Sequence, residues 1–170
     1  MAITLLLGGA RSGKSARAEA LAKGLSLPVC YVATAPHING DKAWESRIIK
    51  HQKQRPADWL VIEEPLALVG LLQGGDFAQH IVLVDCLTLW LSNMMFAEKD
   101  INQEVLRLCE VIEHYQGEVI FVSNEVGLGL VPETELGRNF RDAQGRLNQA
   151  MAKVADKVEF IAAGLPLKLK

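Results

Sequence analysis

A glycine-rich loop near the start of the chain constrains the fold more than any other feature. Residues 8–15 read Gly-Gly-Ala-Arg-Ser-Gly-Lys-Ser and fit the pattern G-x-x-x-x-G-K-[ST] of loops that bind nucleoside triphosphates. The loop follows an apolar run, Ile3–Leu7, and precedes a helix-like stretch, Ala16–Lys23. Strand, loop and helix in this order are the context that the motif requires. A glycine-rich turn that precedes Lys-Ser by chance would not account for both flanks.

The residue types in the loop match the chemistry of phosphate binding. Glycines allow a tight turn, so that backbone N–H groups converge on phosphate oxygens, and the following helix points its positive end at the same place. Lys14 can reach the β- and γ-phosphates, and the Ser15 hydroxyl can ligate Mg²⁺. We therefore predict that the whole loop binds nucleotide: Gly8, Gly9, Ala10, Arg11, Ser12, Gly13, Lys14 and Ser15.

Strand-like and helix-like segments alternate along the rest of the chain. Continuous apolar runs predict strands at Ile3–Leu7, Val29–Ala33, Trp59–Ile62, Ile81–Val84, Val119–Val122 and Val158–Ala162. The segments between them predict helices at 13–23, 42–54, 66–72, 87–96, 102–115 and 138–155. This order predicts an α/β fold with a mostly parallel, doubly wound sheet, whose strands meet ligands at their carboxyl ends. Two long loops, Thr34–Asp41 and Asn124–Gly137, should lie at that edge.

Composition narrows the classes of function. The length of 170 residues and the absence of a linker or repeat predict a single domain over residues 1–170. The net charge of −2 argues against a nucleic-acid partner. The most apolar stretch is interrupted by Asp85, Ser92 and Asn93, so we expect no membrane span, and the start of the chain lacks the pattern of a signal peptide. Three widely spaced cysteines predict buried free thiols in a reducing cytoplasm: Cys30, Cys86 and Cys109.

Several polar residues stand where a ligand could meet them. Asp85 ends a buried strand and could hold Mg²⁺ beside Ser15, or could cap the next helix. Glu63 and Glu64 end another strand and could bind metal, ribose or base, or simply be solvated. His51 lies in a basic stretch, where neighbouring cations favour a neutral, nucleophilic imidazole, but the stretch is also typical of a solvated helix end. The loop 123–129 permits close backbone approach to a ligand, or is an ordinary connection.

Five segments together resemble one enzyme family. They are the loop 8–15, Tyr31–Ala35, the string His51, Arg55, Pro56, Trp59 and Glu63, the stretch Val84–Leu91, and residues 122–148 with Asn124-Glu125-Val126-Gly127 and Phe140-Arg141-Asp142. In this order they resemble the bifunctional adenosylcobinamide kinase / adenosylcobinamide-phosphate guanylyltransferase of cobalamin biosynthesis. The resemblance covers nearly the whole chain.

The resemblance implies a RecA-like, three-layer P-loop domain with two reactions. A nucleoside triphosphate, GTP or ATP, phosphorylates adenosylcobinamide; GMP from GTP then passes through a histidine to the cobinamide phosphate, releasing pyrophosphate. The guanylylated histidine falls on His51. Mg²⁺, a cytoplasmic location and a homotrimer are implied as well. The family's further nucleotide contacts fall on Ala33, Thr34, Ala35, Gln52, Lys53, Gln54, Glu63 and Asp85.

Two other functions are compatible with the phosphate-binding loop alone. One is a RecA-like ATPase, for which the small size and acidic charge are unfavourable. The other is a P-loop kinase of another small alcohol, without nucleotidyl transfer. Labelling of the protein by GTP that carries the label at its α-phosphate would separate these possibilities.

Overall fold

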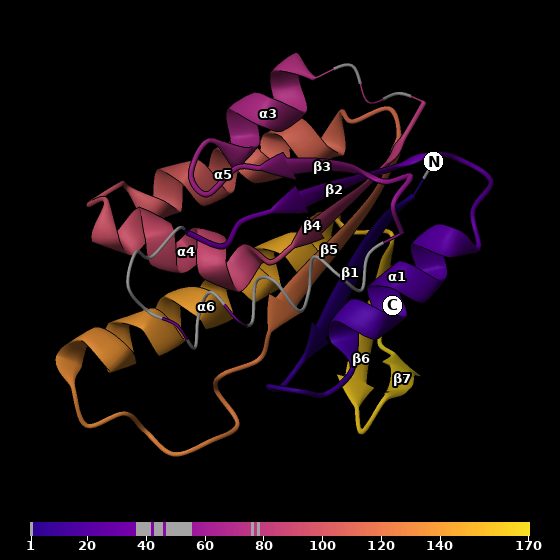
Figure 1. Cartoon of the computed structure of the whole chain (residues 1–170). Helices are drawn as coiled ribbons and strands as arrows, with labels where there is room; N and C mark the ends of the chain where they lie inside the picture. Colours follow the sequence, from indigo (N-terminus) through magenta and orange to yellow (C-terminus); the bar gives the residue numbers. More distant parts are fainter. Residues whose placement is uncertain (1, 37–41, 43–45, 47–55, 76, 78) are drawn as a thin grey trace.

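The computed structural model describes residues 2–36, 42, 46, 56–75, 77 and 79–170. In this part of the chain, seven strands form one sheet in the order β3-β2-β4-β5-β1-β6-β7 (Figure 1). All neighbouring pairs are parallel except β6 and β7, which are antiparallel. The prediction of a mostly parallel α/β sheet is therefore confirmed. The helix predicted at 42–54 lies largely outside the described residues.

The strand predictions are correct to within one or two residues, with one omission. The strands are β1 (Ile3–Gly8), β2 (Val29–Ala33), β3 (Leu60–Glu63), β4 (Ile81–Asp85), β5 (Glu118–Asn124), β6 (Lys157–Ala162) and β7 (Leu165–Lys168). The sequence did not predict β7, a fully exposed four-residue strand that contains Pro166. Proline is tolerated there because β7 is an edge strand, and a short exposed strand leaves no apolar run to detect.

Helices cover both faces of the sheet (Figure 1). On one face, α1 (Lys14–Lys23) packs its Ala18 and Ala22 against the sheet residues Leu6, Ile120 and Val122. The opposite face is covered by α3 (Leu68–Gly74), α4 (Leu87–Phe96), α5 (Ile101–Glu113) and α6 (Glu135–Val154). Successive side chains of a strand point to opposite faces of the sheet, so the helix that a side chain contacts shows its face. We call the face covered by α1 the α1 face.

Two helices begin directly after a residue whose side chain caps their first turn. Asp100 caps α5 by accepting a hydrogen bond from the backbone N–H of Gln103, and Thr134 caps α6 by accepting one from Gly137. The prediction that the last helix begins at residue 138 was therefore wrong: the Thr134 hydroxyl satisfies an N–H group of the first turn, which starts the helix at Glu135.

Parallel pairing brings the carboxyl ends of six strands, β1 to β6, to one edge of the sheet. Gly8 pairs with Asn124, and Ala33 pairs with both Asp85 and Glu63. The two predicted functional loops leave this edge, at Thr34 and after Asn124. The fold thus gathers the sequence-predicted polar residues of the described chain on one side of the molecule.

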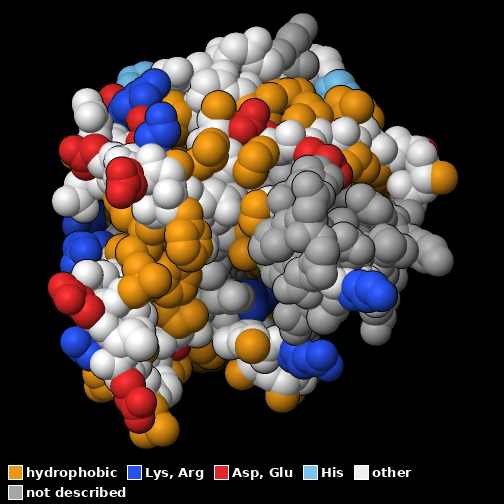
Figure 2. All heavy atoms as spheres, turned by 60° about the vertical axis from the view of Figure 1, so that its left-hand side comes forward, with side chains coloured by type: hydrophobic (Ala, Val, Ile, Leu, Met, Phe, Trp, Pro, Cys, Tyr) orange, Lys and Arg blue, Asp and Glu red, His pale blue; other side chains and the backbone are white. Residues whose placement is uncertain are grey.

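The surface and the three cysteines can be compared with the expectations from composition. None of the helices in the described ranges is both long and apolar enough to cross a membrane. On the face drawn in Figure 2, the described Lys and Arg side chains form small separate groups interspersed with Asp and Glu. All three cysteines are unpaired; Cys30 and Cys86 are buried as predicted, whereas Cys109 is only half-buried.

The hairpin of β6 and β7 is tied to α1 by an ion pair with two hydrogen bonds. Arg17 donates from Nε and Nη2 to the two carboxylate oxygens of Glu159, each at 2.8 Å. The guanidinium lowers the pKa of the Glu159 carboxyl below its usual value, mainly through these hydrogen bonds. The ion pair therefore contributes fully to stability above the pKa that the Glu159 carboxyl has in the unfolded chain. Its contribution is lost as the pH falls through the lower pKa of this carboxyl in the folded protein.

We predict that Glu159→Gln lowers the free energy of unfolding by about 1 kcal/mol at pH 7 and has no effect near pH 2. Urea unfolding at both pH values measures this. Glu104→Gln is the matched control, because Glu104 pairs with the more exposed Arg107 within one helix and should cost only a few tenths of a kcal/mol. A loss for Glu159→Gln that persists at low pH would contradict the assignment.

Candidate functional site

The loop at residues 8–15 presents backbone N–H groups that no side chain occupies. α1 begins at Lys14; its N-cap, Gly13, makes no side-chain capping bond, and the first turn carries no acidic residue. The first N–H groups of a helix have no partner within the helix, and they attract anions. The loop is therefore built to accept an anion from outside the chain.

Two of the loop glycines are required by close packing against the carboxyl-terminal hairpin. A Cβ atom at Gly8 would lie 2.4 Å from the carbonyl oxygen of Ile161. Gly13 has φ 102°, and a Cβ there would lie 3.1 Å from the Cα of Gly164. The Gly164 N–H donates to the Ser12 carbonyl at 2.8 Å. The hairpin of β6 and β7, whose second strand the sequence did not predict, thus packs directly against the loop.

Lys14 is the buried cation of the site. Its side chain is almost fully buried, at 7% exposure, and its Nζ donates to the Gly9 carbonyl at 2.6 Å. Burial lowers the pKa of the Lys14 ammonium, although the nearby Cys86 and Asp85 act in the opposite direction. A partly desolvated cation beside open N–H groups gains more from an incoming anion than an exposed lysine would.

Asp85 lies at the end of β4 with its carboxylate toward the α1 face. It accepts a hydrogen bond from the Tyr31 hydroxyl at 2.9 Å. The alternative that Asp85 caps the next helix is not supported, because the N-cap of α4 is Cys86 and no side-chain capping bond forms. The Ser15 hydroxyl and the Asp85 carboxylate are hard oxygen donors of the kind that Mg²⁺ takes together with phosphate and water. These residue types fit the predicted metal.

Thr34 joins the end of β2 to the start of α4. Its fully buried hydroxyl donates to the Cys86 carbonyl at 2.7 Å and accepts from the Cys86 N–H at 2.8 Å. Asn93 donates from Nδ2 to the carbonyls of Thr34 and Pro65, which links the loops that follow β2 and β3. The Thr34 hydroxyl is thus engaged within the protein, which leaves the half-buried Ala35 as the more accessible neighbour along this segment.

Glu63 and Glu64 have different roles in the structure. Glu64 accepts from the backbone N–H groups of Leu66 and Ala67, so it holds the turn between β3 and α3. Glu63 is exposed at the end of β3 and shares a register row with Ala33. Since β3 is four strand positions from β1, Glu63 lies about 19 Å along the sheet from the phosphate loop. That separation favours a contact with a ribose or base over a contact with a metal ion at the predicted site beside Ser15.

The remaining predicted residues fall outside the part of the chain that the structure describes. These are the candidate nucleophile and its neighbours, His51, Gln52, Lys53 and Gln54. Two other histidines are described. His80 precedes β4 and His114 precedes β5, so both lie at the amino edge of the sheet, away from the loop.

A buried polar network beside the loop was not predicted. Ser123 donates to Asn148 Oδ1 at 2.7 Å, and Gln144 donates from Nε2 to both Ser123 and Asn148. Asn148 donates to the Asn124 carbonyl, and the Asn124 N–H donates to the Thr88 hydroxyl. The spacing of Gln144 and Asn148, four residues apart on a predicted helix, was the available signal, because such residues share a helix face.

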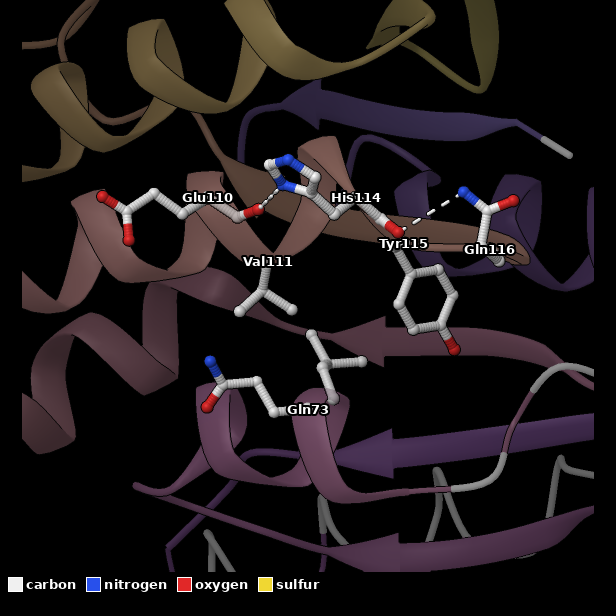
Figure 3. Close-up of a pocket in the computed structure, with 7 residues that line it drawn as sticks. Gln73, Glu110, Val111, His114, Tyr115 and Gln116 are labelled. Atoms are coloured by element: carbon white, nitrogen blue, oxygen red, sulfur yellow. Dashed lines mark hydrogen bonds between the residues drawn. The ribbon is translucent and has the colours of Figure 1, made fainter.

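A second hollow lies at the opposite edge of the sheet. It has a volume of about 390 Å³ and is lined by α3, α5 and the residues that follow α5, including Gln73, Glu110, His114 and Tyr115 (Figure 3). Because His114 and Tyr115 directly precede β5, this cavity is at the amino edge. It is separate from the edge that carries the phosphate loop.

Comparison of the sequence with known proteins gives matches over almost the whole chain. The model of the family described as cobinamide kinase / cobinamide phosphate guanyltransferase matches residues 4–169. The bifunctional adenosylcobalamin biosynthesis protein CobP of Pseudomonas aeruginosa is 46% identical over 168 residues, which cover 98% of this chain and 96% of that protein. The bifunctional adenosylcobalamin biosynthesis protein CobU of Escherichia coli K12 is 36% identical over 181 residues and is covered to 98%, as is this chain.

Solved structures are similar in fold only. A protein of Pyrococcus horikoshii OT3 superposes with a TM-score of 0.57 at 11% identity, over 99% of this chain and 86% of that one. An ATPase of a bacterial type III secretion system also gives 0.57, at 10% identity, over 98% of this chain and 56% of that one. The likeness to an ATPase, together with the parallel sheet and the loop, confirms the predicted RecA-like fold.

We predict opposite outcomes for alanine at adjacent loop glycines. Gly8→Ala should lower the free energy of unfolding by about 2 kcal/mol or more, because the Ile161 carbonyl is backbone and cannot move aside. Gly9→Ala should leave it unchanged within about 0.5 kcal/mol, since no atom lies within 4 Å of the added Cβ. Urea unfolding of the two variants without nucleotide measures the difference. Equal stabilities would show that the hairpin does not support the loop.

Proposed function

The chain belongs to the cobinamide kinase / cobinamide phosphate guanyltransferase family, and we propose that its site at the carboxyl edge of the sheet catalyses both reactions. The first phosphorylates adenosylcobinamide with a nucleoside triphosphate. The second transfers GMP from GTP to the resulting phosphate, giving adenosylcobinamide-GDP and pyrophosphate. The observation that carries the proposal is the buried Lys14 ammonium within a loop whose N–H groups are open to an anion.

In the kinase reaction, the loop and Lys14 hold the β- and γ-phosphates. The substrate hydroxyl oxygen bonds to the γ-phosphorus, the bond from that phosphorus to the bridging oxygen breaks, and the hydroxyl proton is released. Negative charge moves onto the bridging oxygen of the departing diphosphate. Lys14 and the N–H groups at the start of α1 stabilise this charge, and they are already oriented before the reaction begins.

In the guanylyl transfer, His51 is the proposed nucleophile. Its imidazole nitrogen bonds to the α-phosphorus of GTP and pyrophosphate departs, leaving a phosphoramidate. An oxygen of cobinamide phosphate then displaces the histidine and takes the GMP. Two displacements replace one difficult step, provided that the nitrogen comes within about 3–3.5 Å of the phosphorus. Gln52, Lys53 and Gln54 would contact the same nucleotide.

Mg²⁺ is proposed as the metal, held by the Ser15 hydroxyl and the Asp85 carboxylate. When bound, Mg²⁺ neutralises phosphate charge and orients the phosphoryl oxygens. The chain's contribution is to fix the two oxygen donors. Asp85 is held by the Tyr31 hydroxyl, and Ser15 follows the buried Lys14 at the start of α1.

The position of Glu63 supports a role at the other end of the nucleotide. With the phosphates at β1, a contact about 19 Å along the edge belongs to the ribose or the base. Ala33, Thr34 and Ala35 lie at the end of β2, between these two ends of the site. A cytoplasmic location and a homotrimer, both implied by the family resemblance, complete the proposal.

We predict that Mg²⁺ and GTP labelled at the α-phosphate will give an acid-labile label on the wild-type protein. His51→Ala should remove it, because no other histidine is proposed to attack the phosphorus. His114→Ala is the matched control and should label normally, since His114 is exposed at the opposite edge of the sheet. Undiminished label in His51→Ala would reject this nucleophile. Kinase activity without any label would identify a single-activity kinase, and DNA-stimulated or RNA-stimulated ATP turnover would instead favour an ATPase.

We predict that Asp85→Asn raises the Mg²⁺ concentration needed for half-maximal kinase activity at least tenfold, because a neutral amide is a weaker ligand than a carboxylate. Tyr31→Phe removes the hydrogen bond to Asp85 but keeps the carboxylate, so its effect should be smaller. Magnesium titrations of both variants measure this. An unchanged requirement in Asp85→Asn would show that Asp85 does not hold the metal.

A further inference from the structure

Asn124 occupies a position between the two elements that define the nucleotide site. It is the last residue of β5, which lies between the loop strand β1 and the Asp85 strand β4. Asn124 pairs with Gly8 on β1, so the two residues are on adjacent strands about 4.8 Å apart. On the other side, the pairing of β4 with β5 ends at Asp85 and Val122.

The Asn124 side chain points to the face of the sheet that carries the site. Ser123 points to the opposite face, where it bonds to Gln144 and Asn148 of α6. Side chains alternate along a strand, so Asn124 points to the α1 face, as Ile120 and Val122 do. Asp85 shares this face, and Lys14 begins the helix that covers it.

The backbone of Asn124 is held by hydrogen bonds from outside the sheet, because β4 ends before it reaches this residue. Beyond Val122, β4 has ended, so the groups of Asn124 that face it have no ladder partner. The Asn124 N–H donates instead to the Thr88 hydroxyl at 2.8 Å, and its carbonyl accepts from Asn148 Nδ2 at 3.0 Å. The next residue, Glu125, donates its N–H to the Gly8 carbonyl at 2.9 Å. The residue is therefore held from α4, α6 and β1 at once.

The side-chain carboxamide of Asn124, unlike its backbone, forms no hydrogen bond within the described part of the chain. The residue is half-buried. A backbone held on three sides, with an amide that forms no hydrogen bond and lies on the α1 face at the carboxyl edge, is the arrangement of a residue that serves a ligand. The purpose of fixing the backbone would then be to aim the amide.

We propose that the Asn124 carboxamide is a further residue of the nucleotide site, donating from Nδ2 to the terminal phosphoryl group of the bound triphosphate. This inference rests on the proposed function of the site. Lys14 Nζ, which reaches the β- and γ-phosphates, lies at the Gly9 carbonyl, one residue from the strand position that pairs with Asn124. Asn124 is thus beside the terminal phosphates and far from the ribose end. A neutral donor adds a hydrogen bond there without a second buried cation.

Comparison of triphosphate and diphosphate binding tests this contact. The probes are the Mg²⁺ complexes of the β,γ-imido analogue of GTP and of GDP, titrated by calorimetry into the full chain. Asn124→Ala should bind the triphosphate analogue about tenfold more weakly and GDP within twofold of wild type, since only the triphosphate carries the group that Asn124 contacts. Asn102→Ala, at an exposed position of α5, is the matched control and should bind both as wild type does.

Lys14→Ala separates a failure of this inference from a failure of the site. Because Lys14 reaches both terminal phosphates, its loss should weaken both ligands. If Lys14→Ala binds both nucleotides as tightly as wild type, or wild type binds neither, the proposed site is wrong and the role of Asn124 is wrong with it. If Lys14→Ala weakens both while Asn124→Ala changes neither, or changes both equally, only the inference about Asn124 is overturned.

Thr88 provides an independent test of whether the fixed backbone orients the Asn124 carboxamide. Thr88→Val removes the hydrogen bond to the Asn124 N–H and should reduce the preference for triphosphate over diphosphate, whereas Thr88→Ser should restore it. If Asn124→Ala does not fold, the isosteric Asn124→Asp replaces it. Repulsion should then weaken the triphosphate analogue more than GDP, and equal weakening of the two ligands would overturn the proposal.

Discussion

The burial of the Lys14 ammonium within the loop is the constraint on which the rest of the site depends. A buried lysine is costly unless it is compensated, and here the nearest oxygen is the neutral Gly9 carbonyl. The burial exists because the loop is packed closely on the hairpin of β6 and β7, where Gly8 and Gly13 leave no room for a side chain. In the proposed function, a bound phosphate would offset the cost of burying the Lys14 ammonium, and the packing of the hairpin would then contribute to the affinity of the site.

The order of the strands decides which residues can cooperate around that cation. β5 is inserted between the loop strand and the Asp85 strand, so Asp85 and the loop are two strand positions apart rather than adjacent. The last residue of β5, Asn124, therefore lies between the loop and Asp85. Thr88 and Asn148 replace the ladder bonds that β4 no longer offers, and the Glu125 N–H bonds to Gly8 of β1, so the backbone of Asn124 stays held although the pairing with β4 has ended.

The sequence was sufficient for the loop, the parallel sheet and the carboxyl-edge residues, because long apolar runs and a specific motif are local signals. It could not reveal β7, whose exposed residues form a strand only by pairing with β6. Nor could it predict that Glu63 and Glu64 differ in role, because the hydrogen bonds of Glu64 depend on how the chain turns between β3 and α3. The polar network of Ser123, Gln144 and Asn148 joins residues up to 25 positions apart, and only the packing of α6 on β5 brings them together.

The same geometry suggests how one loop can serve two phosphorus atoms. With the phosphates at β1 and the ribose or base at Glu63, as proposed, a bound GTP would extend along the carboxyl edge with its α-phosphate toward β4 and β2. The chain leaves this edge at Ala33, and the segment that carries His51 follows before β3 begins at Leu60. In the proposed function, a nucleophile from that connection would react at the α-phosphate, whereas the hydroxyl that reacts with the γ-phosphate would approach near β1 and β5. On that proposal the two reactions would use different positions along one nucleotide, which would not have to rebind in the opposite direction.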